Sequence, residues 1–200
     1  MLEDLTFKSL GIVNYYETLE QMRSHINEDE FKNEIWILEH PPVFTLGTAA
    51  NKKHILDSKE IPIIQSDRGG EVTYHGPGQI VIYFLLDIKR LNCGPNKLVA
   101  TIQDFVKELL LKLAIECNLK DGAPGVYVNK RKIASIGLRI SKGKSYHGIS
   151  LNFDMDLSPF KQINPCGYKG LEVTQIKDLN KDISKLELHK MIIDTLRKVF

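Results

Sequence analysis

The chain has 200 residues, of which 42% are hydrophobic and 26% are charged, and its formal net charge is +2. These values are ordinary for a soluble globular protein, and they lack the strong basic excess that nucleic-acid binding needs. The longest apolar run, residues 80–86, is far shorter than the roughly 20 residues that span a bilayer. We therefore expect one domain over residues 1–200, with no membrane and no nucleic-acid partner.

The cysteines indicate a reducing compartment. Cys93, Cys117 and Cys166 are widely spaced, and no C-x-x-C pair is present. This pattern supports neither a zinc site nor a disulfide framework, and the six histidines show no metal-ligand spacing either. The start of the chain, residues 1–4, is acidic and has no apolar core of a signal peptide. We expect a cytoplasmic protein with reduced thiols and no metal.

Hydrophobic periodicity in the first half predicts strands around one helix. The helix is expected over residues 15–26, where apolar side chains recur on one face. Strands are expected where β-branched and aromatic residues gather, at residues 5–10, 34–39, 43–47, 61–64 and 80–86. The last two, on either side of a glycine-rich segment, are predicted to be buried.

The second half predicts a long helix, short strands and a closing helix. The long helix is expected to be capped by Asn96 and to end near residue 117. Strands follow at residues 126–128, 132–140 and 146–153, with a hairpin turn at 141–144. The closing helix, 184–199, begins with a capping box of Ser184 and Glu187. Together the pattern predicts an α+β fold.

The glycine-rich segment, residues 68–79, reads R-G-G-E-V-T-Y-H-G-P-G-Q. Glycine allows a backbone to approach a ligand closely, and Gly76-Pro77-Gly78 predicts a turn. Taken singly, each residue fits a tight loop with a hydrogen-bonded histidine. A loop that only reverses the chain does not need Arg68, Thr73, Tyr74 and His75 beside its glycines, so the combination favours a ligand site. The spacing does not match a phosphate-binding loop.

Cys166 is a candidate nucleophile because it lies in a loop between Pro165 and Gly167. Cys93 has similar flanks, so local context does not separate the two, whereas Cys117 is expected to be a small buried hydrophobe. A nucleophilic cysteine needs a nearby cation or a helix N-terminus.

The candidate activators of the thiol are Lys132, Arg68, His75 and His147. Lys132 opens an apolar strand, and spacing alone favours a solvent-facing side chain over one that points into a cleft. A basic group formed by residues 130–132 with Lys142 and Lys144 suits an acidic protein partner or a solvated surface.

Five motifs in order resemble the lipoyl(octanoyl) transferases, the lipoate-protein ligase B family. Each is weak alone, and together they are specific. Glu71 stands where the family commonly has glutamine. The motifs are H-P-P-V-F-T-L-G at 40–47, the glycine-rich segment at 68–79, K-I-A-S-I-G at 132–137, H-G-I-S-L-N at 147–152 and N-P-C-G at 164–167.

The resemblance implies a fold like the catalytic domain of biotin and lipoate protein ligases, with mixed β-sheets and flanking helices. It implies transfer of an octanoyl group from octanoyl-acyl carrier protein to a specific lysine of a lipoyl domain. The acceptors would be the lipoyl domains of 2-oxoacid dehydrogenase complexes and the glycine cleavage H protein. Exchange between thioesters is nearly balanced in energy, so the family needs no ATP, and we expect no cofactor.

The resemblance also implies residue roles. Cys166 would form an acyl-thioester, and Lys132 would lie beside it, favour the thiolate and later act as a base. The backbone of the glycine-containing segments would approach the acyl chain. The implied substrate-binding residues are Arg68, Gly69, Gly70, Glu71, Val72, Thr73, Tyr74, His75, Ser135, Ile136, Gly137, Gly148, Ile149 and Ser150.

Two alternatives remain open. A lipoate or biotin ligase shares the fold and activates a free acid with ATP, but its R-R-x-S-G-G-G or G-R-G-R motif is absent and it has no need of Cys166. The other alternative is a binding module that holds an acyl group or a carrier without catalysing a reaction, and the presence of both Cys166 and Lys132 argues against it. Measurements of acyl transfer and of its dependence on ATP distinguish a transferase, a ligase and a binding module.

Overall fold

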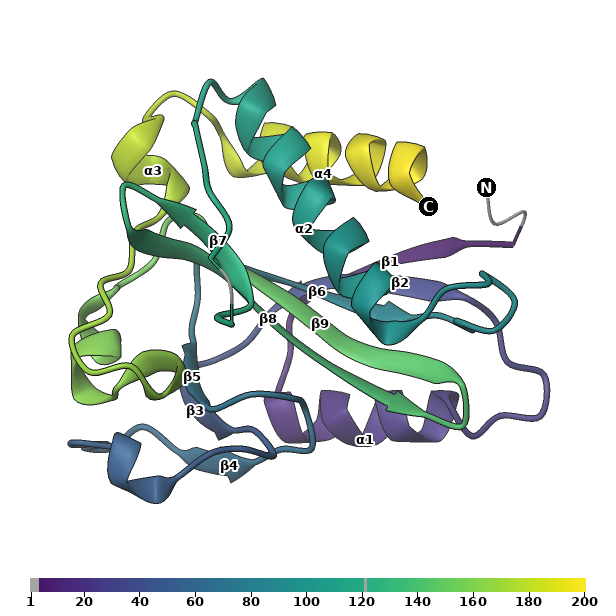
Figure 1. Ribbon diagram of the computed structural model, residues 1–200, viewed down its shortest axis with the longest axis horizontal. Coiled ribbons are helices and arrows are strands. Elements are labelled where there is room, and N and C mark those ends of the chain that lie inside the picture. The colour runs from purple at the N-terminus through teal and green to yellow at the C-terminus, as the bar shows by residue number, and fades with distance from the viewer. Residues whose placement is uncertain (1–3, 121) are drawn as a thin grey trace.

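The computed structural model describes residues 4–120 and 122–200, and it has the expected α+β architecture of two sheets with flanking helices (Figure 1). Within these residues the larger sheet has the strand order β1-β2-β6-β9-β8-β7, and the smaller has the order β4-β3-β5. The strands are β1 Thr6–Ile12, β2 Glu34–Glu39, β3 Val43–Leu46, β4 Ile63–Gln65, β5 Val72–His75, β6 Gln79–Leu85, β7 Gly125–Val128, β8 Arg131–Ser141 and β9 Lys144–Asn152.

The helices lie on both sides of the larger sheet, with α1 on one face and α2 and α4 on the other (Figure 1). None of the described helices is both long enough and apolar enough to cross a bilayer. The α-helices are α1 Tyr15–His25, α2 Pro95–Lys112, α3 Ile176–Leu179 and α4 Lys185–Val199, and the 3₁₀ turns are η1 Lys52–His54, η2 Ser158–Gln162 and η3 Pro165–Gly167.

Strands β2 and β6 of the larger sheet are buried on both faces, which explains why their inner residues are apolar without interruption. On β2, Ile35 and Ile37 belong to the core under α2 and α4, whereas Trp36 and Leu38 pack with α1. Strand β6 alternates in the same way. Successive side chains of a strand point to opposite faces, so a strand between two helix layers needs an apolar residue at every position.

The ends of α1 and α4 follow local capping chemistry. Asn14 accepts hydrogen bonds from the first turn of α1, which spans the predicted segment to within one residue. The predicted capping box of α4 is present, because the Ser184 side chain accepts from the Glu187 N–H and the Glu187 side chain accepts in return. Both caps satisfy backbone donors that a helix leaves free at its start.

The predicted boundaries of α2 are wrong at both ends. The helix begins at Pro95 after Gly94, and Asn96 is not its cap. Proline suits the first helical position because the N–H that it lacks would be unpaired there. The helix ends at Lys112 because Ala114 has a left-handed φ of 57°, which a right-handed helix cannot continue.

The smaller sheet has a core of its own, in which Phe44 and Tyr74 pack against Phe160 of η2. The sequence predicts a buried strand over residues 61–64, but β4 starts at Ile63 and lies at the edge of this sheet. Ile63 is 43% exposed, because only β3 pairs with β4 among the described strands. The β-branched composition therefore identified a strand and misjudged its burial.

Candidate active site

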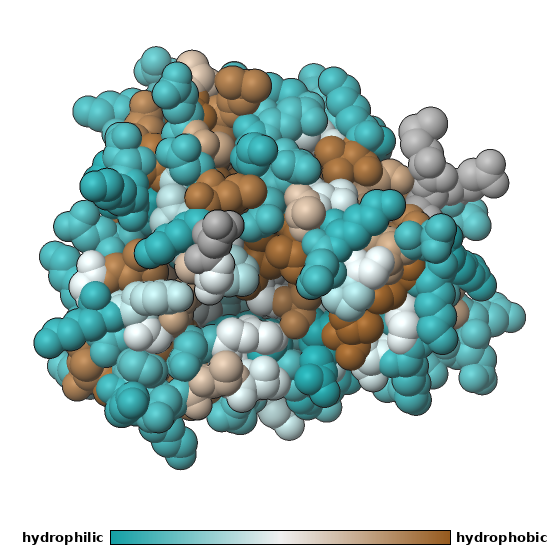
Figure 2. Space-filling view, in the orientation of Figure 1, coloured by the Kyte–Doolittle hydropathy of each residue, from teal (hydrophilic) through white to brown (hydrophobic). Residues whose placement is uncertain are grey.

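A cavity of about 500 Å³ lies between the loop 68–71, strands β8 and β9, the segment 122–124 and the turn η3. On the face shown in Figure 2 the surface is mostly hydrophilic, and hydrophobic side chains gather near its middle, over α2 and β8. The structure brings nearly all the predicted site residues into this one cavity: Arg68, Gly69, Gly70, Glu71, Val72, Thr73, His75, Lys132, Ser135, Ile136, Gly137, Gly148, Ile149, Ser150 and Cys166.

Tyr74 is the predicted site residue that does not line the cavity. It lies between Thr73 and His75 on β5, where alternate side chains point to opposite faces of the sheet. Its ring packs against Phe44 and Phe160 in the core of the smaller sheet. The glycine-rich segment is therefore a loop, a strand and a turn, and within the strand Tyr74 is directed away from the cavity.

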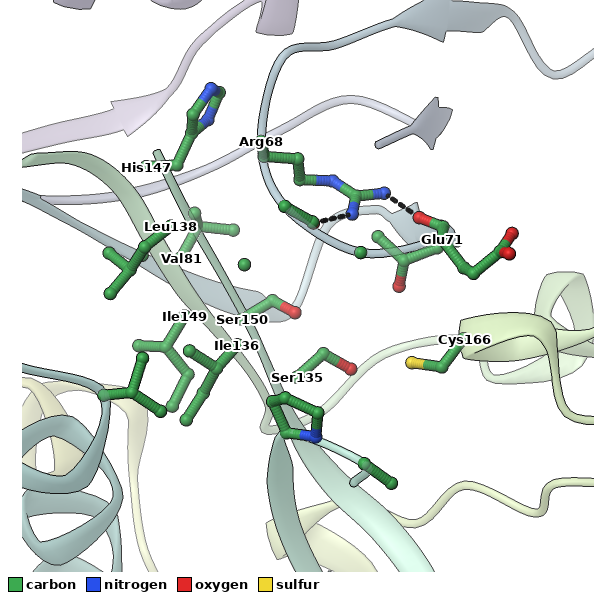
Figure 3. A pocket seen from close by; sticks show the side chains of 18 of the residues that line it. Arg68, Glu71, Val81, Ser135, Ile136, Leu138, His147, Ile149, Ser150 and Cys166 are labelled. Atoms are coloured by element: carbon green, nitrogen blue, oxygen red, sulfur yellow. Dashed lines mark hydrogen bonds between the residues drawn. The ribbon is translucent and has the colours of Figure 1, made fainter. Parts of the chain in front are cut away.

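Cys166 lies at the partly buried corner of a tight turn. Cys166 and Gly167 both have positive φ, 55° and 76°, and the Tyr168 N–H donates to the Pro165 carbonyl at 3.1 Å. Positive φ at both central residues is typical of a type I′ turn, and it is unusual for a residue other than glycine, asparagine or aspartate. Figure 3 shows the sulfur directed toward Ser135, into the cavity.

The other two cysteines lie elsewhere. Cys93 Sγ lies 3.5 Å from the carbonyl oxygen of the neighbouring Gly94, and Cys117 packs at the margin of the main core. Burial raises the pKa of the Cys117 thiol, which makes it a poorer nucleophile. Geometry therefore separates Cys166 from Cys93, which sequence context did not.

Lys132 is buried and lies beside Cys166. Its side chain is 2% exposed, and its Nζ lies 3.0 Å from Cys166 Sγ and 3.0 Å from the Pro124 carbonyl oxygen. The solvent-facing orientation favoured by spacing is wrong, whereas the proximity implied by the family resemblance is present. The ammonium and the thiol form a hydrogen-bonded pair at the cavity wall.

Two local features admit the lysine side chain. The pairing of β7 with β8 shifts register between Val126 and Tyr127, so that Ile133 is an extra residue on β8. Such a bulge changes the direction of nearby side chains. Gly125 leaves the space, because a Cβ there would lie 2.7 Å from Lys132 Cε. Neither the bulge nor the role of Gly125 is visible in the sequence pattern.

Arg68 shapes the glycine-rich loop. Its guanidinium donates to the carbonyl oxygens of Gly69, Glu71 and Thr45 at 2.9, 2.7 and 2.7 Å, and its Nε donates to Thr45 Oγ1 at 3.1 Å (Figure 3). Most of its donors are thus used inside the protein. The Gly69 N–H in turn donates to the Leu138 carbonyl at 3.0 Å, which fixes the loop against β8.

Two of the candidate activators of the thiol are buried histidines. His75 and His147 are 5% and 1% exposed. Burial lowers the pKa of both, although the hydrogen bond of His147 to Asp67 at 2.8 Å acts in the opposite direction. Both imidazoles are therefore neutral at pH 7, and the cations of the cavity are Lys132 and Arg68.

A chain of buried amides joins the motifs. His75 Nδ1 bonds with Gln79 Oε1 at 2.7 Å, Gln79 Nε2 donates to Asn152 Oδ1 at 2.9 Å, and Asn152 Nδ2 donates to the Thr174 carbonyl at 2.9 Å. The Thr174 N–H donates to the Lys132 carbonyl at 3.0 Å. Gln79 and Asn152, the last residues of the motifs at 68–79 and 147–152, therefore connect the glycine-rich segment to the strand that carries Lys132.

The basic group noted in the sequence divides in two. Lys142 and Lys144 contact the end of α1, where Lys142 Nζ donates to Asn27 Oδ1 and Lys144 Nζ donates to the Ile26 carbonyl, both at 2.8 Å. These two lysines stabilise the chain after α1. Lys130 is exposed on the turn before Lys132.

No group of three or more metal-ligating side chains occurs within residues 4–120 and 122–200. The polar groups that line the cavity are the Cys166 thiol, the Lys132 and Arg68 cations, the Glu71 carboxyl and the imidazoles of His75 and His147, beside apolar side chains. Val81, Leu138 and Tyr83 also line it and were not among the predicted site residues. The sequence did not identify these three residues as part of the site, because each lies in a strand that the sequence assigns to the core.

Comparison with known proteins agrees with this geometry. The lipoyl protein ligase A/B catalytic domain matches residues 14–197. The octanoyltransferase of Dechloromonas aromatica is 55% identical over 175 residues, which cover 86% of this chain and 85% of the relative. That of Shewanella loihica is 52% identical over 193 residues, covering 96% and 88%. The chain belongs to the octanoyltransferase family. Membership of this family makes it a transferase enzyme and confirms the family resemblance of the five motifs.

Solved structures show the same fold at low identity. A bipartite lipoate protein ligase from Thermoplasma acidophilum superposes with a TM-score of 0.75 at 14% identity, covering 100% of this chain and 84% of that protein. Biotin protein ligase from Aquifex aeolicus gives a TM-score of 0.56 at 17% identity, covering 99% and 70%. The octanoyltransferase family therefore shares its fold with these ligases, as expected, and the fold alone does not decide between transfer and ligation.

Proposed function

We propose that the protein transfers an octanoyl group from octanoyl-acyl carrier protein to a lysine of lipoyl domains through a thioester on Cys166. The acceptors would be the lipoyl domains of 2-oxoacid dehydrogenase complexes and the glycine cleavage H protein. The observation that carries the proposal is the contact of 3.0 Å between Lys132 Nζ and Cys166 Sγ at the wall of a cavity with an apolar lining.

In the first half-reaction the Cys166 thiolate attacks the thioester carbonyl of the donor. The adjacent ammonium of Lys132 favours the thiolate, since an opposite charge within a few ångströms stabilises the charged form. A bond forms between Cys166 Sγ and the acyl carbon, and the bond to the donor sulfur breaks. The departing thiolate takes a proton from the Lys132 ammonium, which leaves a neutral amine beside the new thioester.

In the second half-reaction the neutral Lys132 amine acts as the base. The neutral amine of the lipoyl-domain lysine attacks the acyl carbon, and Lys132 accepts the one proton that this nitrogen loses as the amide forms. The bond to Cys166 Sγ breaks, and the thiolate returns beside a Lys132 ammonium. One acyl group and one proton are moved in each half, so neither ATP nor a cofactor is needed.

The cavity suits a medium-length acyl chain. Its volume of about 500 Å³ is in the ordinary range for small-molecule sites. Val81, Ile136, Leu138 and Ile149 supply apolar walls, and Figure 3 shows them together on the left, away from Cys166. Gly137 leaves room for the loop, because a Cβ there would lie 2.9 Å from the Gly69 carbonyl oxygen.

A donor for the carbonyl oxygen is available at Thr73. Its hydroxyl is buried, has no hydrogen-bond partner among the described residues, and belongs to a side chain that lines the cavity. Strand β5, which carries Thr73, packs against η3, which carries Cys166. A buried donor without a partner costs free energy, and an acyl oxygen would satisfy it.

The test is octanoyl transfer to an apo lipoyl domain with and without ATP, in the wild type and in Cys166→Ala, Cys93→Ala and Cys117→Ala variants. We expect transfer without ATP, loss of transfer only in Cys166→Ala, and near-normal rates in the other two. Transfer by Cys166→Ala, or a requirement for ATP, would favour a ligase. Binding of the acyl group without any transfer would favour a binding module.

A further inference from the structure

Lys132 contacts two groups that have no role in the proposed reaction, the Pro124 carbonyl and the Tyr127 ring. Its Nζ has three N–H donors, of which one points to Cys166 Sγ and one to the Pro124 carbonyl oxygen, each at 3.0 Å. Among the described residues no carboxylate pairs with it. The remaining neighbour is the aromatic ring of Tyr127, whose centroid lies 5.3 Å from Nζ.

Tyr127 also fixes the backbone that binds Lys132. The residue is 4% exposed, and its hydroxyl donates to the Ala123 carbonyl oxygen at 3.2 Å. The next carbonyl along the chain, that of Pro124, accepts the hydrogen bond from Lys132. Tyr127 and Lys132 are also direct cross-strand partners at the register shift between β7 and β8. One side chain thus contacts the ammonium by its ring and secures the carbonyl by its hydroxyl.

The titratable groups in direct contact with the ammonium are the Cys166 thiol on η3 and the ring of Tyr127. Glu71 supplies a carboxyl group to the lining of the same cavity, and Lys132 forms no ion pair with it. Arg68 is the other cation that interacts with Cys166. Burial raises the pKa of Tyr127, although Lys132 acts in the opposite direction, so this phenol is neutral at pH 7. Tyr127 therefore carries no phenolate charge to pair with the ammonium, which instead lies 5.3 Å from the centroid of its neutral ring.

We propose that Tyr127 is a positioning residue of the transferase, whose ring holds the Lys132 ammonium against Cys166 while its hydroxyl secures the carbonyl that shares the ammonium. The effect of Tyr127 on acyl transfer rests on the proposed function, whereas its contacts with Lys132 and with the Ala123 carbonyl do not. A cation over an aromatic face is stabilised most when both are shielded from water, and both side chains are buried here.

The two roles of Tyr127 are separable by substitution. Tyr127→Phe removes the hydroxyl and keeps the ring, whereas pentafluorophenylalanine at position 127 keeps the shape and removes the negative face of the ring. Tyr127→Leu removes ring and hydroxyl together. We expect the rates of alkylation and acylation of Cys166 to fall only slightly in Tyr127→Phe. They should fall roughly tenfold or more with pentafluorophenylalanine and with Tyr127→Leu, and most in Tyr127→Leu.

The experiment measures alkylation of Cys166 by iodoacetamide at pH 7 and its single-turnover acylation by octanoyl-N-acetylcysteamine, with intact mass as the readout. Each substitution at 127 is made alone and in a Lys132→Met background, which gives a double-mutant cycle. If the ring acts through the Lys132 ammonium, a substitution at position 127 should not change either rate further once Lys132 is methionine.

The outcomes decide the inference independently of the proposed function. Equal alkylation and acylation rates with phenylalanine and with pentafluorophenylalanine at position 127 would overturn the role of the ring. So would an equal fall in these rates in the wild-type and Lys132→Met backgrounds. If Tyr127→Leu fails to fold, the fluorinated variant still gives the answer because its shape is unchanged. Acylation of a residue other than Cys166 would reject the proposed function, whereas the alkylation cycle would still report the contact between Tyr127 and Lys132.

Discussion

In the proposed mechanism both half-reactions depend on Lys132, because its single amine would first lose and then regain a proton. Its Nζ touches Cys166 Sγ at 3.0 Å. General acid–base groups contribute about 10²- to 10⁴-fold to a rate. We expect Lys132→Met to lower octanoyl transfer by roughly 100-fold or more, measured as single-turnover acylation of Cys166.

Lys130 provides the control for that change. It lies on the exposed turn before β8, so Lys130→Met removes the same charge two residues away without touching the cavity. Its rate should stay close to that of the wild type. If Lys132→Met alters neither thiol reactivity nor transfer, the proposed role of the lysine is wrong.

Gly125 is the residue that makes the buried lysine possible. A Cβ at this position would lie 2.7 Å from Lys132 Cε and 2.5 Å from the Ala134 carbonyl oxygen. We expect Gly125→Ala to displace the lysine, slow acylation at least about tenfold and lower stability by about 1–3 kcal/mol through strain. Gly94→Ala, at the N-cap of α2, meets nothing within 4 Å and should leave the acylation rate unchanged. Normal acylation by Gly125→Ala would show that the lysine tolerates displacement.

The orientation of Lys132 shows where residue patterns stop being informative. Strand periodicity places a lysine at the start of an apolar strand in solvent, and that is the commoner outcome. Here a bulge of one residue and a missing Cβ on the neighbouring strand reverse it. Both depend on the pairing of β7 with β8. Only the family motif, which carries that pairing implicitly, placed Lys132 beside Cys166.

At the scale of elements, the loop 68–71 depends on a single guanidinium. Arg68 donates to both the hydroxyl and the carbonyl of Thr45 on β3. Hydrogen bonds to charged groups contribute about 1.5–3 kcal/mol. We expect Thr45→Val to lower the free energy of unfolding by about that amount and to raise the KM for the acyl donor, as measured by denaturant unfolding and steady-state kinetics.

Thr101 on α2 is the matched control, because its hydroxyl makes one local bond to the Lys97 carbonyl at the helix surface. Thr101→Val should change the free energy of unfolding by less than about 0.5 kcal/mol. An unaltered KM in Thr45→Val would mean that the loop keeps its shape without this anchor.

Elements with strong local determinants were predictable, and those set by neighbours were not. Helix α4 carries its own capping box, and the turn at Lys142 and Gly143 has the positive φ values of a tight hairpin. By contrast, the exposure of β4 depends on its edge position, and β5 is recognised as a strand only through its pairing with β3. The motifs identified most of the cavity because they mark its walls.

At the scale of the whole molecule, buried histidines make stability depend on pH. Burial lowers the pKa of His40 from 6.5 to about 4, and it lowers the pKa of His75 and His147 as well. The unfolded chain therefore binds more protons below pH 6.5, and the stabilisation present above that pH is lost as the pH falls toward 4. The His40 shift alone corresponds to about 3 kcal/mol.

We expect the free energy of unfolding, measured in urea between pH 7 and pH 4, to fall steeply. His40→Asn should be less stable at pH 7 and should flatten the slope. His189→Asn makes the same substitution at a partly exposed position of α4 and is the comparison for the slope. A slope that His40→Asn does not reduce would show that His40 is not a source of the acid sensitivity.

In the proposed reaction an octanoyl group passes through Cys166, and the most direct measurement is the intact mass of the protein after incubation with octanoyl-acyl carrier protein without ATP. We expect one octanoyl adduct that maps to Cys166, is absent in Cys166→Ala and is removed by an apo lipoyl domain. No adduct with a fully loaded carrier, or an adduct that persists in Cys166→Ala, would contradict it.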